Sequence, residues 1–393
     1  MSSNKQYISS VNPRTLHVYW WVLTYCLSKN AVGLVETLGV IAYGAGQIIS
    51  GILGDRLKPH RMVSIGLFIS IIMNFLMPVC PFSLRGYVWF INGFGQSMLW
   101  PPLLRILISI MDAKTYEDTA INMNIAGICG TLIVYLTSSL LWIRLFNSWK
   151  LTFYMSASIA FIILIIWLMN INKIDDVISI ADKNIKLENK KDNSLTYKLI
   201  IDSGFFYIAI AIILHGMLRD GISDWVPSIL ANTFDLSSDG AIFKAIIIPL
   251  IGMISLKITG LINKHFVKEE LKASAIFFIF ATILCVLLTV FYSHDLYVTL
   301  FLSSLIVGIM NAINFFLVGV IPAGFERYGL VSTMSGIINS LTYIGSALSI
   351  YGFGFISERY GWNACICLWA IIAALGTLSC LISIASWKRF KKH

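Results

Sequence analysis

The sequence predicts an all-α membrane protein with about 12 transmembrane helices in two six-helix bundles, and three observations predict it. Hydrophobic residues make up 57% of the 393 residues and charged residues only 12%, about half of what soluble proteins carry. Apolar runs of about 20 residues recur along the whole chain, and each is long enough to cross a bilayer as a helix. The longest polar stretch, residues 172–198, divides these runs into two equal sets.

The boundaries of the apolar runs place the expected helices to within a few residues. The first two runs occupy only residues 15–53, which is just enough for a shortened hairpin that turns around Ser28 and Lys29. One long tilted helix, with the N-terminus outside, is the alternative there. The expected spans are 15–29, 31–53, 62–80, 86–111, 120–143, 149–171, 204–231, 240–262, 273–293, 296–322, 331–357 and 362–387. The chain then divides into an N-terminal bundle (1–171), a solvated cytoplasmic linker (172–198) and a C-terminal bundle (199–393).

Lys and Arg are distributed unevenly between the two sides of these spans. With the N-terminus inside, twenty Lys and Arg lie in the inner segments and four in the outer loops. Cytoplasmic loops carry the excess of positive charge in membrane proteins. The sequence therefore predicts that both termini are cytoplasmic, with the plasma membrane as the default location.

Several other classes of protein do not fit the sequence. It shows no nucleophile–base pair, metal-ligand cluster or phosphate-cradling glycine loop, so we expect neither an enzyme nor a bound cofactor or metal. The net charge of +9 does not indicate nucleic acid binding, because the charges lie in loops between apolar runs. The expected partners are a small solute and the lipid bilayer, and the chain is expected to be a monomer.

The loop after the second span combines glycines with a charged cluster, Gly51-Ile52-Leu53-Gly54-Asp55-Arg56, followed by Arg61. Glycines allow two helices to cross closely. Asp55 can pair with a neighbouring helix end or arginine in one state and release it in another. We expect Asp55, Arg56 and Arg61 to form a cytoplasmic gate, and an ordinary positive loop is the alternative. The pattern resembles the signature of the major facilitator superfamily, whose six-plus-six helix fold matches the outline above.

Two further segments resemble the organophosphate:phosphate antiporter family within that superfamily. The fourth span contains Gln96 followed by Trp100-Pro101-Pro102 and Arg105, and the seventh contains Arg219 followed by Gly221 and Asp224-Trp225. The Pro-Pro pair should kink its helix. Arg105 is expected near the cytoplasmic end, in a gating or structural role. The resemblance implies that Arg219 binds the phosphate of a solute that is exchanged for inorganic phosphate.

Arg219 is also the strongest candidate on physical grounds alone. A cation at bilayer depth costs roughly 2.5–3.5 kcal/mol on insertion scales, so it faces a protein interior or a watery path. Its guanidinium matches a phosphate or carboxylate through two parallel hydrogen bonds. The alternative is an internal pair with Asp220 or Asp224. Asp220 is expected to be a poor partner, because adjacent side chains on a helix point about 100° apart.

The chain departs from the antiporter pattern at three cationic or titratable positions. Ser28 stands where the family has an arginine in the first span, and Lys29 is the residue that could replace it. Gln47 stands at the family's basic position in the second span. In the fifth span Asn122 matches a family asparagine, whereas the nearby family histidine is Ile125. These departures leave the phosphate specificity open.

The expected function is a secondary active transporter that moves a small organic anion, such as a sugar or glycerol phosphate, by alternating access. A carrier of carboxylates or sugar acids, and a non-transporting sensor or degenerate relic, are the alternatives. Proton coupling has little support, because no titratable acid is obvious at mid-membrane depth. His215 shares a helix face with Arg219. The remaining solute-binding candidates are Tyr25, Lys29, Gln47, Asn122 and Tyr343.

Overall fold

The computed structural model describes residues 29–137, 146, 148–188, 203–236, 244–265 and 269–392, and every regular element in these ranges is a helix. The expected first span, 15–29, lies almost wholly outside them, so the shortened hairpin is not tested. In chain order the elements are α2 (Lys29–Arg56), α3 (Pro59–Leu76), α4 (Phe82–Ser97), α5 (Trp100–Ile110), α6 (Ala113–Leu136), α7 (Lys150–Glu188), α9 (Phe205–Thr233), α11 (Ile247–His265), α12 (Glu270–Phe291), α13 (Leu296–Asn314), η4 (Phe315–Val320), η5 (Ile321–Tyr328) and α14 (Val331–Lys392).

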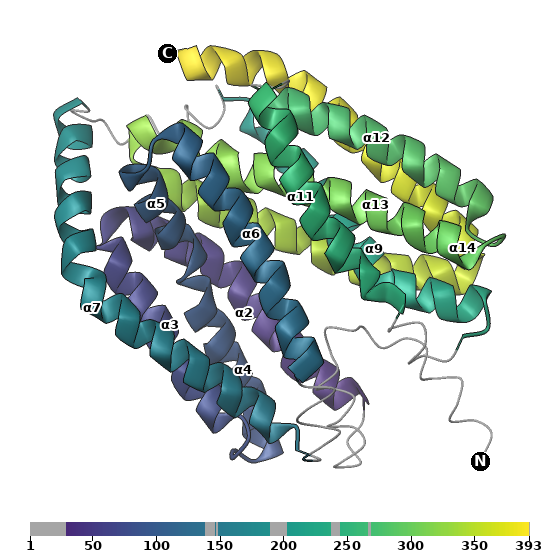
Figure 1. The fold of residues 1–393 in the computed structure, drawn as a ribbon, viewed down its shortest axis with the longest axis horizontal. Helices are drawn as coiled ribbons and strands as arrows, with labels where there is room; N and C mark the ends of the chain where they lie inside the picture. Colours follow the sequence, from purple (N-terminus) through teal and green to yellow (C-terminus); the bar gives the residue numbers. More distant parts are fainter. Residues whose placement is uncertain are drawn as a thin grey trace.

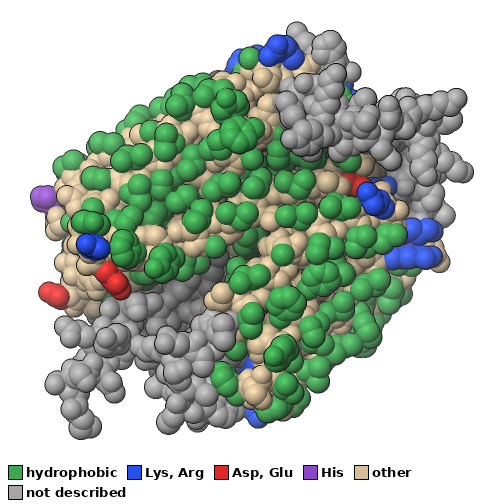
Figure 2. Space-filling model, turned by 180° about the vertical axis from the view of Figure 1, so that it is seen from behind, with side chains coloured by type: hydrophobic (Ala, Val, Ile, Leu, Met, Phe, Trp, Pro, Cys, Tyr) green, Lys and Arg blue, Asp and Glu red, His purple; other side chains and the backbone are tan. Residues whose placement is uncertain are grey.

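The helices fall into two groups that lie side by side (Figure 1). Helices α2, α3, α4, α5, α6 and α7 form the first group, and α9, α11, α12, α13 and α14 form the second. Contacts between the groups run chiefly from α2 and α5 to α14 and from α6 to α11. Seven helices of the described part are long and apolar enough to cross a membrane. Hydrophobic side chains cover the middle of the face in Figure 2, and charged side chains lie toward its ends.

Three features of single helices bear on the predictions. The kink expected at the Pro-Pro pair is confirmed, because α4 ends at Ser97 and α5 begins at Trp100 with proline in its first turn. The last two expected spans form one element, α14, which is interrupted at Gly361 by a non-helical backbone (φ 81°, ψ 171°). Glycine reaches such a positive φ without the steric cost that a Cβ would add.

The first part of the predicted linker is helical. Helix α7 runs past the expected sixth span and continues to Glu188, so it covers residues 172–188 of the predicted linker 172–198; the division into two bundles and a solvated linker stays a prediction. The physical reason lies in the composition of residues 172–188, which contain neither proline nor glycine. Nothing there stops a helix that has already begun in the membrane.

Close crossings at glycine hold the helices together. A Cβ at Gly336 of α14 would overlap the Gln47 carbonyl of α2, and one at Gly51 would meet the Ser332 carbonyl. Within the second group, a Cβ at Gly345 would overlap the Ile213 carbonyl of α9. Lipid is as apolar as the helix surfaces, so membrane helices depend on such close packing for their association. Helix α14 is therefore pressed against both α2 and α9.

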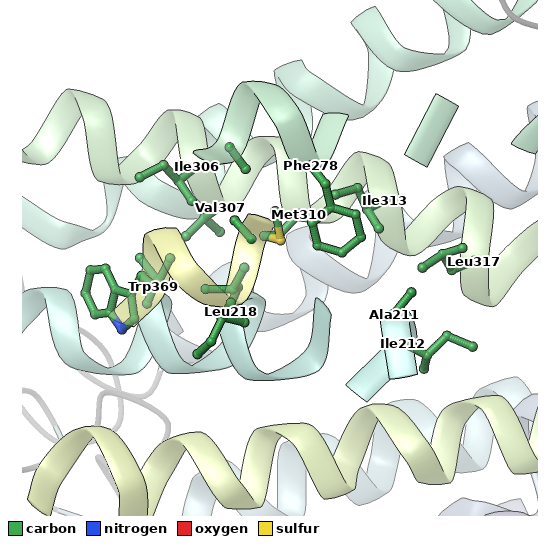
Figure 3. Packing of buried hydrophobic residues seen from close by; sticks show 14 of the residues in the cluster. Ala211, Ile212, Leu218, Phe278, Ile306, Val307, Met310, Ile313, Leu317 and Trp369 are labelled. Carbon is green, nitrogen blue, oxygen red and sulfur yellow. The ribbon is translucent and has the colours of Figure 1, made fainter. Parts of the chain in front are cut away.

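The second group also contains a continuous apolar core. Its members include Leu218, Phe278, Met310 and Trp369 from four different helices, all fully buried (Figure 3). Helices α9 and α13 contact each other within this core. This packing fixes the rotation of α9, and with it the direction in which the polar side chains of that helix leave the core.

Candidate functional site

Arg219 lies near the middle of α9, about 21 Å along the helix from Phe205 at 1.5 Å per residue. Its guanidinium forms a bidentate pair with Asp220: Nε donates to Oδ1 at 2.8 Å and Nη2 donates to Oδ2 at 3.0 Å. The expectation that Asp220 is a poor partner was wrong. The 100° offset applies to the Cβ directions, whereas the arginine side chain is long enough for one edge of its guanidinium to reach the shorter aspartate.

The same guanidinium connects the two groups of helices through a pair of amides. Nη1 of Arg219 donates to Oδ1 of Asn314 at 2.8 Å. The Nδ2 of Asn314 in turn donates to Oδ1 of Asn124 on α6 at 3.2 Å. Asn314 is the last residue of α13, and the π-helical turn η4 follows it at once. Such turns are rare and often occur at functional sites.

Two tyrosines and a glutamine line the neighbouring contact between α2 and α14. The rings of Tyr43 and Tyr343 meet edge to face, with centroids 4.9 Å apart. Gln47 is fully buried one turn along α2 from Tyr43. Tyr43 lies near enough to Arg219 for the charge of the guanidinium to act on its hydroxyl. The structure thus brings Gln47 and Tyr343 to the surroundings of Arg219, and it adds Tyr43, which precedes Gln47 by one helical turn and could have been found from that spacing.

His215 was predicted to face the solute together with Arg219, but the structure places it elsewhere. The imidazole is fully buried, and its Nε2 lies 3.0 Å from the main-chain oxygen of Met310 on α13. In this conformation the ring packs α9 against α13 and presents no surface to a solute. The i, i+4 spacing correctly places His215 and Arg219 on one side of α9. That side is broad enough to include a fully buried position, that of His215, and a partly exposed one, that of Arg219.

A second membrane cation, Lys257, was overlooked in the sequence. It lies in the apolar helix α11, and its Nζ donates to Oδ1 of Asn122 on α6 at 3.1 Å. This bond also joins the two groups of helices. The signal was a lysine eight residues before the end of an otherwise apolar helix. It gives the predicted solute ligand Asn122 a cationic partner.

Two predicted ligands are not placed by the structure. Tyr25 lies outside the described residues, as does Ser28, at which the family arginine is missing. Lys29 begins α2, but its side chain is outside the described part. The contribution of the first span to the site therefore stays a prediction.

The predicted gate residue Asp55 lies at one end of the contact between α2 and α14. Its Oδ1 accepts from the main-chain N–H of Ser332 at 2.9 Å and its Oδ2 from that of Thr333 at 2.6 Å. These are the first N–H groups of α14, which have no partner within the helix and carry its partial positive charge. A carboxylate from one group of helices thus caps a helix of the other.

The other predicted gate residues are arranged around this contact. Arg105 donates through Nη1 to the Gly54 carbonyl and, at 3.5 Å, to the Leu57 carbonyl, so it caps the C-terminal end of α2. Arg56 and Arg61 have exposed side chains. Nearby, the Tyr116 hydroxyl on α6 donates to the Gly319 carbonyl of η4. Two hydrogen-bonded contacts therefore link the two groups of helices at this end of the molecule, and the gating role of these residues stays a prediction.

Comparison with known proteins identifies the family. The sequence pattern described as Major Facilitator Superfamily matches residues 15–350. The chain belongs to this superfamily. Superfamily members of this kind are transporters and not enzymes, which agrees with the sequence analysis. The solved structure of the proton:xylose symporter XylE shares the superfamily fold with this chain, with a TM-score of 0.71 and 14% identity over 95% of this chain and 91% of that one.

Curated relatives confirm the narrower resemblance to organophosphate carriers. The glycerol-3-phosphate transporter of Bacillus subtilis is 25% identical over 86% of this chain and 80% of its own length. A protein named "Probable hexose phosphate transport protein" of Chlamydia pneumoniae is 19% identical over 93% of this chain and 84% of its own. The membrane sensor protein UhpC of Escherichia coli is 20% identical over 90% of this chain and 83% of its own.

Proposed function

We propose that this superfamily member is a secondary active transporter that moves a small organophosphate, such as glycerol phosphate or a sugar phosphate, by alternating access. The observation that carries the proposal is the position of the Arg219 guanidinium in the middle of α9, where it bonds Asn314 and through it Asn124 of the other group of helices. In transporters of this design the solute binds near the midplane between the two halves. The names of the relatives support the phosphate class.

The proposed solute contacts follow from the chemistry of the cluster around Arg219. A phosphate oxygen would take the place of the Asn314 amide on Nη1, because guanidinium binds phosphate more strongly than a neutral amide. The hydroxyl groups of Tyr43 and Tyr343 and the amide of Gln47 suit the hydroxyl groups of a glycerol or sugar moiety. Lys257, held by Asn122, would supply the second positive charge that Ser28 no longer provides.

We also propose a direction for the closed end. Lys and Arg are concentrated on the side that carries the α2–α3 turn and the end of α14, which would make it the cytoplasmic side, with both termini there. The contacts of Asp55 and Tyr116 then close the cytoplasmic entrance in this conformation. Release of Asp55 from α14 would open it.

Counterflow in proteoliposomes tests the proposal. Purified protein is reconstituted with unlabelled glycerol-3-phosphate, glucose-6-phosphate, inorganic phosphate or glucuronate inside, and labelled glycerol-3-phosphate is added outside. We expect exchange with the phosphorylated compounds, and exchange with phosphate itself would make the carrier an antiporter. Arg219→Lys should reduce the rate by about 100-fold, since it removes one bidentate charge-assisted contact of about 1.5–3 kcal/mol. Arg359→Lys, at an exposed position of α14 just before the break at Gly361, is the matched control and should exchange at the parent rate.

Two other functions have specific support and are separated by the same assay. With labelled glucuronate outside instead, counterflow against glucuronate, and no uptake of labelled glycerol-3-phosphate, would identify a carboxylate carrier, for which one arginine suffices. A sensor is favoured by the missing arginine at Ser28 and by the pairing of Arg219 with Asp220, and a membrane sensor is among the relatives. Stabilisation of the protein by glycerol-3-phosphate in a thermal-shift measurement, with no counterflow, would select the sensor.

A further inference from the structure

We propose that Asp220 is a proton-coupling carboxylate: its protonation releases Arg219 for the anionic solute, so that the anion and a proton cross the membrane together. The inference rests on the proposed function, since it takes Arg219 as the solute ligand. It adds a source of energy for accumulation that the sequence analysis did not predict. It also reverses the expectation that no titratable acid lies at mid-membrane depth.

The carboxylate and the guanidinium of this pair differ in their surroundings. Asp220 is 1% exposed, whereas the Arg219 side chain is 21% exposed. Asp220 accepts from Nε and Nη2 of Arg219 and also from the Ser346 hydroxyl of α14. The close crossing of α9 and α14 at Gly216 and Gly345 presses these two helices together around it. The acid is thus sealed within the second group of helices, and the arginine extends from it toward the first group.

The solute and Asp220 compete for the same cation. The charges of Arg219 and Asp220 cancel, so an anion that arrives while Asp220 is ionised adds an uncompensated negative charge beside a carboxylate. Two like charges within one site raise the proton affinity of one of them, as in paired carboxylates. A carboxylic acid in place of the carboxylate leaves the guanidinium with its full positive charge for the solute. Ser346 can then accept a hydrogen bond from the protonated acid instead of donating one.

The cycle balances in protons and returns the Arg219–Asp220 pair to its starting charge. A proton from water on the open side adds to one carboxylate oxygen of Asp220, and the only bond that forms is O–H. The guanidinium stays protonated throughout, because arginine side chains are not deprotonated in proteins. After the halves rock, the solute leaves on the other side, Asp220 returns the proton to water there, and the Arg219–Asp220 pair forms again. One proton therefore moves with each solute anion.

Other ionisable groups near the Arg219–Asp220 pair could also contribute to a pH dependence, and they lie on α9, α14 and α2. On α9 itself these are His215 one turn before Arg219 and Asp224 one turn after Asp220, both buried. Tyr343 on α14 and Tyr43 on α2 are phenols that ionise far above neutral pH. Helix α13 contributes the neutral Asn314 and the Met310 carbonyl. Among the described groups, Asp224 is the second acid that a control must remove.

The experiment measures glycerol-3-phosphate uptake into proteoliposomes with and without an inward proton gradient, in three proteins. For the parent we expect accumulation driven by the gradient, with binding that strengthens about tenfold per unit of pH lowered while Asp220 titrates. Asp220→Asn should keep counterflow and lose gradient-driven accumulation, and its binding should change with pH only through ionisation of the solute itself. Asp224→Asn should accumulate as the parent does.

The other outcomes separate a failure of the proton role of Asp220 from a failure of the proposed transport function. Gradient-driven accumulation by Asp220→Asn, or active counterflow in the parent with no response to the gradient, overturns the proton role and leaves the transporter intact. If no protein carries glycerol-3-phosphate, the proposed function fails for this solute, and a pH titration of the infrared carboxyl band then decides the inference. A protonated-acid band that appears on acidification in the parent and Asp224→Asn but not in Asp220→Asn supports it, and its absence from the parent overturns it.

Discussion

The contact of Asp55 with the first turn of α14 gives the sharpest prediction about opening of the closed end. Each carboxylate oxygen accepts one main-chain N–H, from Ser332 and from Thr333. Asp55→Asn leaves a single acceptor oxygen and turns an amide NH₂ toward the other N–H. One charged hydrogen bond is lost and the second becomes neutral, which should cost about 2–3 kcal/mol. The equilibrium between closed and open ends should then shift by roughly 30- to 150-fold toward open.

Cysteine accessibility measures this shift. Ser332→Cys provides a reporter that is fully buried and faces α2 at Gly54, in a background without the seven native cysteines. With purified protein in nanodiscs, the maleimide labelling rate follows the open fraction while that fraction is small. Asp55→Asn should raise the rate by the factor above.

The chain offers a matched control in Asp295, which caps α13 within one group of helices. There a single oxygen, Oδ1, accepts from both Tyr297 and Val298 N–H, so an asparagine oxygen can replace it. Asp295→Asn should leave the labelling rate unchanged. An unchanged rate in Asp55→Asn, or an equal increase in both variants, would refute the assignment of Asp55 to the closed end.

The remaining predictions concern packing and charge. Gly336→Ala should destabilise the closed end by about 1–3 kcal/mol, because its Cβ would overlap the Gln47 carbonyl. The labelling rate of the Ser332→Cys reporter measures this change. Gly352→Ala on the same helix should have no effect on the rate, because a Cβ there would have no atom within 4 Å. Lys257→Gln should weaken binding of glycerol-3-phosphate by about tenfold more than binding of glucuronate, because the doubly charged phosphate loses one charge contact of about 1.4 kcal/mol. Competition binding measures the ratio of the two affinities, and equal weakening of both would exclude a charge role for Lys257. Arg105→Gln should leave solute binding unchanged but speed labelling of the reporter by roughly tenfold, because the α2 carbonyls lose a charged donor.

The sequence predicted those features that depend on local chemistry. The helix break before Pro101 follows from the covalent structure of proline, and the position of Asp55 beside a helix end follows from a glycine-lined crossing next to a charged loop. The Arg219–Asp220 pair was missed because spacing on a helix gives side-chain directions but not the reach of a long side chain. Lys257 was missed because its partner Asn122 lies 135 residues away, in a helix that only the folded structure brings alongside.

Helix α14 connects the closed end with the central cluster. Ser332 and Thr333, which bind Asp55, are about four turns from Ser346, which binds Asp220. The first non-helical backbone within α14 comes later, at Gly361, so these residues lie on one continuous helical segment. Close crossings press that segment against α2 at Gly336 and against α9 at Gly345. In the proposed transporter, a rearrangement of the Ser346–Asp220–Arg219 contacts on solute binding would therefore shift the same helix whose first turn is held by Asp55. Tightly packed helices move between discrete arrangements rather than deform gradually, so we expect solute binding and opening of this end to be coupled through the position of α14.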